Sequence, residues 1–337
     1  MEHSFSLDEV EVLAFETLTS AGASSPAARA VARSTRLAER DGIRSHGLLY
    51  LPIYAEHLLC GKVSVSATPS VTTPRSGLVH VDADHGFAHT AIDAGWDKLT
   101  QAARANGIAA MSVKNSYNCG VLGHHAERLA TDGLIGLCFT HAPASIAPPG
   151  GKLPVVGTNP FSIAVPDAQG GALLVIDQSA SAIAKSEILL RSREGEPIEP
   201  GWALDAEGNE TLDADAALVG SMLPAGGYKG FGVGLLVEIL AAALTGANLS
   251  TEASPFSGSK GGPPGTGQFF IAIDPAGSGE GGFNGAMMRL AASITDQPGA
   301  RLPGQRRAVN RARIEAEGVS ISDDLLARIR AAAALPT

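Results

Sequence analysis

Apolar side chains recur at helical spacing through the first 60 residues. A helix is expected over 7–18, because a capping box begins at Ser6. A second helix is expected over 26–40, with proline at its first position and Asp41-Gly42 at its end. A third apolar stretch covers 46–60. The chain is therefore predicted to open with a helical segment.

The pattern then changes to short apolar runs that alternate with helical stretches. Strands are expected at 78–81, 108–113, 134–140, 161–165, 172–176 and 269–273. Helices are expected at 88–105, 120–131, 181–193, 230–247 and 282–295, and from 304 onward. The order strand, helix, strand, helix, strand between 78 and 140 predicts a substantial sheet with crossover helices. The glycine-led helix over 230–247 is apolar enough to predict burial on most sides.

Two segments do not fit this alternation. Residues 195–225 are polar and rich in Pro, Gly and Asp, which is typical of a long excursion. The segment SPFSGSKGGPPGTG at 254–267 has the composition of a mobile loop.

Composition narrows the class of protein. The 337 residues are 45% hydrophobic and 18% charged, which allows two lobes with a substantial core and excludes overall disorder. The net charge of −9 disfavours nucleic acid as a main partner. The cysteines, Cys60, Cys119 and Cys138, are odd in number and have no paired spacing, which favours a reducing compartment. The acidic N-terminus is unlike a signal peptide, and Glu238 interrupts the longest apolar run. We expect a cytoplasmic protein without a membrane partner.

Nucleotide and metal motifs are missing from the chain. The patterns G-x-G-x-x-G and G-x-x-x-x-G-K-[ST] do not occur, so a standard Rossmann domain is disfavoured. A nicotinamide coenzyme stays possible, because backbone amides at any helix N-terminus can hold phosphate. His85 and His89 stand four apart without a third ligand at suitable spacing, so no metal site is expected.

Arg44-Ser45-His46-Gly47 is the first candidate for proton chemistry. A histidine beside a hydroxyl at a turn is suited to act as a general acid or to orient a substrate. Taken alone, the same residues are explained better by Ser45 capping a helix whose first turn exposes His46.

Further candidates stand at predicted strand and helix ends, and each has a structural alternative. Residues 115–120 open a helix and form either an anion cradle or a set of caps. Asp177-Gln178-Ser179 is either a cap or a site for ribose and amide groups, and Glu187 is either solvated or a proton donor. Lys229 begins an apolar helix and is a candidate phosphate contact. Arg306-Arg307, near a helix start, suits either a phosphate or a solvated basic face.

Five segments, taken together and in order, resemble the malate/L-lactate dehydrogenase family, which is distinct from the Rossmann lactate dehydrogenases. They are SHGLLYLPIYAEHLLCGKV, HAPASIAPPGGKLPVVGTNPFSIAVP, REGEPIEPGWALDAEGNET, GGYKGFGVGLLVEILAAALTGA and RLPGQRR. The resemblance implies an α/β, non-Rossmann NAD(P)-binding fold with a mixed sheet and a helical domain built from both termini. It implies residues 1–70 with 300–337 as the helical, dimerisation domain, and 71–299 as the cofactor- and substrate-binding domain. It also implies a homodimer.

The resemblance also assigns residue roles. Ser45 and His46 match the family's catalytic pair, and Glu187 matches its acidic proton donor. Substrate contacts fall on His46, Tyr50 and Thr158. Cofactor contacts fall on Asn118, Cys119, Gly120, Val121, Leu122, Thr158, Asp177, Gln178, Ser179, Tyr228, Lys229, Gly304, Gln305, Arg306 and Arg307.

Two departures from the family pattern refine the expected reaction. Many members carry Arg where this chain has Tyr50, and His-Phe-Gly where it has Asn118-Cys119-Gly120. A ketone needs a proton after hydride addition, whereas a cyclic iminium already carries one. The chain is therefore expected to reduce cyclic 2-imino acids as Δ1-pyrroline-2-carboxylate/Δ1-piperideine-2-carboxylate reductases do, with NADPH preferred and NADH possible. The alternative is an NAD-dependent 2-hydroxyacid dehydrogenase.

Overall fold

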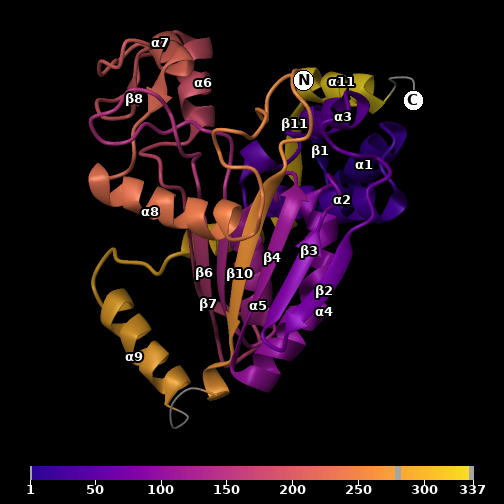
Figure 1. Cartoon of the computed structure of the whole chain (residues 1–337), viewed down its shortest axis with the longest axis vertical. Helices are drawn as coiled ribbons and strands as arrows, with labels where there is room; N and C mark the ends of the chain where they lie inside the picture. The colour runs from indigo at the N-terminus through magenta and orange to yellow at the C-terminus, as the bar shows by residue number, and fades with distance from the viewer. Residues whose placement is uncertain (1, 278–281, 334–337) are drawn as a thin grey trace.

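A seven-stranded mixed sheet forms the centre of the computed structural model, which describes residues 2–277 and 282–333 (Figure 1). The strand order is β2-β3-β4-β10-β5-β6-β7. The strands are β2 (Ser70–Arg75), β3 (Leu78–Asp82), β4 (Ile108–Ser116), β5 (Ile135–Thr140), β6 (Phe161–Pro166), β7 (Ala172–Gln178) and β10 (Thr266–Ile273). The predicted α/β class and the mixed sheet are confirmed.

The late strand β10 makes this sheet mixed. β3 and β4 are parallel and are joined by α4 (Ala88–Asn106), as the alternation predicts. β4 and β5 are connected through α5 (Leu122–Thr131), but β10 lies between them and is antiparallel to both. A strand that arrives about 130 residues later in sequence is not visible in a local pattern.

Successive residues of the central strands face two different cores. Met111, Cys138 and Phe270 pack with α4 and α5 on one face. Phe139 and Phe269 pack on the other face with α8 (Tyr228–Glu238) and the π-helical turn Ile239–Ala243. This period of two explains why the strands contain nearly continuous apolar runs.

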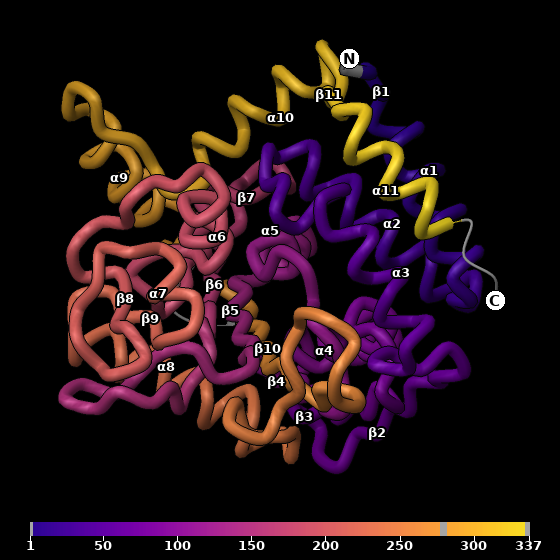
Figure 2. The backbone as a smooth tube through the Cα atoms, turned by 90° about the horizontal axis from the view of Figure 1, so that it is seen from above, coloured from indigo at the N-terminus to yellow at the C-terminus, as the bar shows by residue number. Residues whose placement is uncertain are grey.

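Both chain ends build the helical domain. β1 (Glu2–Phe5) pairs with β11 (Val319–Ser322), and α11 (Asp323–Ala333) packs on α1 (Leu7–Ser20) and α3 (Leu51–Leu59). α2 (Ser25–Arg40) connects this layer to α4. The boundaries at 70 and 300 stay a prediction, since α10 (Gln305–Glu317) runs between the two parts (Figure 2).

A third, small lobe stands where the sequence predicts only an excursion. α6 (Lys185–Glu194), β8 (Ala203–Leu204), α7 (Ala214–Val219) and β9 (Ser221–Met222) surround their own apolar core. Ile146, Ile198 and Met222 belong to that core, which joins residues from distant parts of the chain. Such a small core is assembled by tertiary contacts and leaves no periodic signal.

Several predicted helices begin later than expected. α3 begins at Leu51 with Pro52 in its first turn, and Arg44–His46 forms a separate 3-10 turn before it. α5 and α6 start at Leu122 and Lys185 instead of 120 and 181, and β11 interrupts the C-terminal helix. The expectation that 230–247 is buried on most sides is wrong, because Leu236 and Ile239 are about half exposed, at 50% and 54%.

The segment expected to be a mobile loop is fastened to the helical domain. Lys62 Nζ donates to the carbonyls of Pro255 (2.6 Å) and Ser257 (3.5 Å), and Tyr50 Oη donates to that of Phe256 (3.1 Å). His57 Nε2 lies 3.1 Å from the Gly258 carbonyl oxygen. Side chains in and next to α3, distant in sequence, therefore hold this loop in a defined conformation. η3 (Pro275–Gly277) and α9 (Phe283–Thr295) complete the described elements.

Candidate active site

Ser45 and His46 lie on the short 3-10 turn that connects α2 to α3. Ser45 Oγ is 3.0 Å from His46 Nδ1, so the hydroxyl fixes one side of the imidazole. The ring reaches solvent, yet enough protein surrounds it that desolvation lowers its pKa, opposed by nearby Asp177. An imidazole that reaches solvent beside a hydroxyl is suited to exchange a proton with a bound substrate.

Asp177, at the end of β7, joins two of the predicted cofactor segments. Its Oδ2 accepts the Gly123 backbone N–H at the start of α5 (3.1 Å) and Arg307 Nη2 of α10 (2.7 Å). A Cβ on Gly123 would lie 2.5 Å from Arg307 Nη1 and 2.6 Å from Asp177 Oδ2, so only glycine allows this approach. The amino ends of α5 and α10 therefore meet at this carboxylate.

A cavity of about 680 Å³ opens beside Asp177. One wall is made by the β7 end and the α10 segment, including Gln178, Gly304 and Arg306. Residues 41–43, which lead directly into the Ser45-His46 turn, form the other wall. Of the predicted site residues, Asp177, Gln178, Gly304, Arg306 and Arg307 line this cavity, and residues 41–43 bring the Ser45-His46 turn to its edge.

Further predicted site residues lie on the side of the small lobe, namely Thr158, Ser179 and the first residues of α8. The Ala180 N–H donates to the Thr158 carbonyl (2.8 Å), and the Ala225 N–H donates to the Ala180 carbonyl (2.9 Å). Ser179 Oγ is 2.9 Å from Ser181 Oγ. Tyr228 and Lys229 then begin α8 with exposed side chains. Backbone hydrogen bonds therefore connect Thr158 to the segment that follows Asp177, and that segment to the residues that precede α8.

The predicted cofactor-binding segment Asn118–Leu122 offers a ligand mainly backbone groups. Asn118 Oδ1 accepts hydrogen bonds from Tyr54 Oη (2.9 Å) and the Gly120 N–H (3.2 Å). Val121 and Leu122 are buried, and burial raises the pKa of the Cys119 thiol to about 12. The thiol is therefore inert, and any ligand here meets amides and carbonyls.

Two predicted site residues, Tyr50 and Glu187, form contacts away from Ser45, His46 and Asp177. Tyr50 Oη is engaged by the Phe256 carbonyl and lies 3.4 Å from Tyr117 Oη. Glu187 forms an ion pair with Arg191 on α6 (3.3 Å). Within residues 2–277 and 282–333, no hydrogen bond or ion pair joins Glu187 to Ser45, His46 or Asp177.

Comparison with known proteins shows the family to which the chain belongs. Residues 5–330 match the family model described as malate/L-lactate dehydrogenase. The chain belongs to the malate/L-lactate dehydrogenase family.

Relatives from this family match nearly end to end. A (2R)-3-sulfolactate dehydrogenase (NADP(+)) from Chromohalobacter salexigens is 40% identical over 98% of both chains. A Δ1-pyrroline-2-carboxylate reductase from Ancylobacter novellus is 39% identical over 97% of this chain and 96% of its own length. The crystal structure of Δ1-piperideine-2-carboxylate reductase from Pseudomonas syringae superposes with a TM-score of 0.92, at 34% identity, over 98% of this chain and 99% of that one. The resemblance inferred from sequence is confirmed.

The residues around the cavity fit the nicotinamide coenzyme expected of this family. Arg301, Arg306 and Arg307 line it, which suits phosphate groups, and its volume of about 680 Å³ is in the range of small-molecule sites. In the part of the chain that the structure describes, no group of three or more His, Cys, Asp or Glu side chains is arranged to hold a metal ion. The described helices also include none long and apolar enough to span a membrane.

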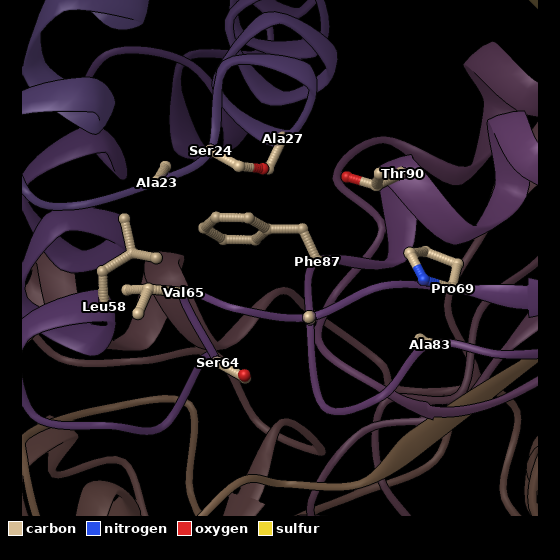
Figure 3. A pocket seen from close by; sticks show the side chains of 12 residues that line it. Ala23, Ser24, Ala27, Leu58, Ser64, Val65, Pro69, Ala83, Phe87 and Thr90 are labelled. Atoms are coloured by element: carbon tan, nitrogen blue, oxygen red, sulfur yellow. The ribbon is translucent and has the colours of Figure 1, made fainter.

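A separate small cavity, around Phe87, contains none of the predicted site residues (Figure 3). Leu58, Val65 and Ala27 contribute to its mainly apolar lining. Its volume of about 10 Å³ is close to that of one water molecule, so it is a packing gap between the helical domain and α4.

Sequence reasoning missed three groups beside the site: Asp41, His124 and Arg311. From sequence, Asp41 is identified only as part of a helix end, although it precedes Ser45 of the predicted catalytic pair by four positions. In the structure its carboxylate contacts both of the other groups. A buried acid next to a motif with two basic partners far away in sequence gives no local signal.

Proposed function

We propose that this protein reduces cyclic 2-imino acids with NAD(P)H, converting Δ1-pyrroline-2-carboxylate to L-proline and Δ1-piperideine-2-carboxylate to L-pipecolate. Relatives named as reductases of these imino acids share up to 40% identity with the chain. The observation that carries the proposal is that Asp177 and residues 41–43, which precede the Ser45-His46 turn, line one cavity. Asn118 adds to it, because it stands where many family members carry histidine. Asn118 Oδ1 accepts hydrogen bonds from Tyr54 and Gly120, and a carboxamide, unlike an imidazole, is not an acid that can give a proton to an alkoxide.

The chain's own residues position the substrate and handle protons. The coenzyme, when bound, supplies the hydride to C2 of the ring. The C=N π electrons then move to the nitrogen, which already carries its proton and becomes a neutral amine. His46, oriented by Ser45, binds the substrate or exchanges a proton with it at Nε2, since Nδ1 faces Ser45 Oγ. Glu187 stays the second proposed proton donor, with its carboxylate on α6.

A 2-hydroxyacid dehydrogenase is the second candidate, because a sulfolactate dehydrogenase is 40% identical to this chain. A substrate panel separates the two. We expect turnover of Δ1-pyrroline-2-carboxylate and Δ1-piperideine-2-carboxylate with NADPH, followed at 340 nm, and little with pyruvate, oxaloacetate or 3-sulfopyruvate. Turnover of keto acids alone would reject imine reduction in favour of the second candidate.

We propose NADPH as the preferred coenzyme because of Arg306. Arg307 is already paired with Asp177, whereas Arg306 lines the cavity with no acidic partner among the described residues. Arg306→Ala is expected to raise the KM for NADPH about tenfold and to leave that for NADH nearly unchanged, since a contact with a charged group contributes about 1.5–3 kcal/mol. Arg313→Ala is the control, because Arg313 pairs with Glu317 on the same helix away from the cavity. Equal losses for both coenzymes would contradict a preference set by Arg306.

We also propose a cytoplasmic homodimer. The three cysteines are free, which agrees with a reducing compartment. Exposed apolar side chains on α8 and the following turns, including Leu235, Leu236, Ile239 and Leu244, form a surface suited to a second copy. Light scattering after size-exclusion chromatography tests the oligomeric state.

A further inference from the structure

Asp41 is a fully buried carboxylate at the end of α2. Its side chain has 0% exposure and contacts Arg40 (2.8 Å), Arg311 (3.0 Å) and His124 (3.1 Å). Burial alone would raise the pKa of Asp41, but hydrogen bonds from His124, Arg311 and Arg40 outweigh it and hold the pKa well below its ordinary value. The group is therefore an anion with several fixed partners, not a solvated helix end.

The partners of Asp41 mirror those of Asp177. Asp177 binds Gly123 of α5 and Arg307 of α10, whereas Asp41 binds the next residue of α5, His124, and Arg311, one turn further along α10. Residues four apart share a helix face, so α10 presents both arginines to the two carboxylates. Figure 2 shows α10 running from the β7 side of the sheet towards β11 and α11. The two acids therefore bridge α5 and α10 at two points, and Arg311 also pairs directly with Glu127 of α5 (3.0 Å).

The second bridge leads directly to the catalytic turn. The Asp41 carbonyl accepts Asn310 Nδ2 (3.2 Å), and a Cβ on Gly42 would lie 2.8 Å from the same amide nitrogen. Gly42 has φ +74, a conformation that favours glycine. On the other side of the turn, buried Glu39 accepts the Leu48 N–H (2.7 Å). The Ser45-His46 turn is thus held from both ends by acids of the last turn of α2.

We propose that Asp41 is a positioning residue that sets the Ser45-His46 turn against the coenzyme-binding ends of α5 and α10. The carboxylate has no exposed surface, so it acts through His124, Arg311 and the backbone and not by touching a substrate. Residues 41–43 also line the cavity opposite Asp177, so a shift at Asp41 moves one wall against the other. This inference rests on the proposed coenzyme-dependent reduction. Displacements of about 1 Å at such sites cost up to 100-fold in rate.

Asp41→Asn tests the proposal with Asp93→Asn as the matched control. Asp93 is also a carboxylate with two arginine partners, Arg33 and Arg128, and links α4 to α2 and α5 without reaching α10. We expect Asp41→Asn to lower kcat and raise the coenzyme KM, each roughly tenfold, and Asp93→Asn to change neither. Unchanged kinetics in Asp41→Asn, with a fall in Tm equal to that of Asp93→Asn, would reduce Asp41 to a structural ion pair.

A second readout does not depend on turnover. The His46 ring resonance, assigned with His46→Asn in histidine-labelled protein, is expected to shift in Asp41→Asn and to stay in place in Asp93→Asn. If wild type turns over no imino or keto acid, the proposed function fails, while this resonance still decides whether Asp41 positions His46. If Asp41→Asn does not fold, His124→Asn cuts only the bridge to α5; the His46 resonance must then shift, or the proposal is rejected.

Discussion

His46→Asn is expected to lower kcat by about 100- to 1000-fold while coenzyme binding stays within twofold of wild type. Positioned proton transfer contributes about 10²–10⁴-fold to rates, and Ser45 Oγ holds the imidazole that would give the imine nitrogen its proton before hydride arrives. Asparagine removes the titrating group without a large change in volume. Stopped-flow kinetics measures kcat, and quenching or enhancement of coenzyme fluorescence measures binding.

The pH profile separates a catalytic His46 from a packing residue. Desolvation lowers the pKa of His46, so its protonated form is lost at a lower pH than for an ordinary histidine. In wild type, reduction should therefore slow as pH rises through that lowered pKa, and His46→Asn should lack this limb. A limb that survives unchanged in His46→Asn would mean that His46 is not the group that titrates.

The local pattern predicted most strands and helices because each has its own periodic signal. β3, α4 and β4 follow one another in sequence and in space, so their arrangement was also predictable. The position of β10 between β4 and β5 was not, since an antiparallel strand with two apolar faces fits several places in a sheet. The third core around Ile198 was missed for the same reason, as its members come from separate turns and short elements.

The candidate site was predicted in part from motifs that carry functional groups. Ser45, His46 and Asp177 were identified because hydroxyl, imidazole and carboxylate groups at turns have an evident chemistry. The surroundings of Asp177 depend on Gly123 and Arg307, which are separated by more than 180 residues and meet only in the fold. The contacts of Asp41 could not be predicted, because Asp-Gly is common at helix ends and is explained there by the turn alone. Its two partners, His124 and Arg311, are distant in sequence and meet it only in the fold.

Lys62 illustrates how a distant side chain can order a loop that composition predicts to be mobile. Its side chain is fully buried, and its ammonium group donates to the carbonyls of Pro255 and Ser257. Within the described residues no carboxylate pairs with it. These carbonyls therefore compensate the desolvation of the buried ammonium group, and the ammonium group holds the loop in its conformation.

Lys62→Met is expected to destabilise the protein by about 2–4 kcal/mol, because buried carbonyls lose their charged donor while the packed volume is retained. Lys260→Met is the control: the same change at an exposed position of the same loop should leave Tm unchanged. Calorimetry measures the stability, and hydrogen exchange over 254–262 measures the order of the loop, which should exchange faster in Lys62→Met alone. Equal Tm values for the two variants, with equal exchange, would mean that the loop is held without Lys62.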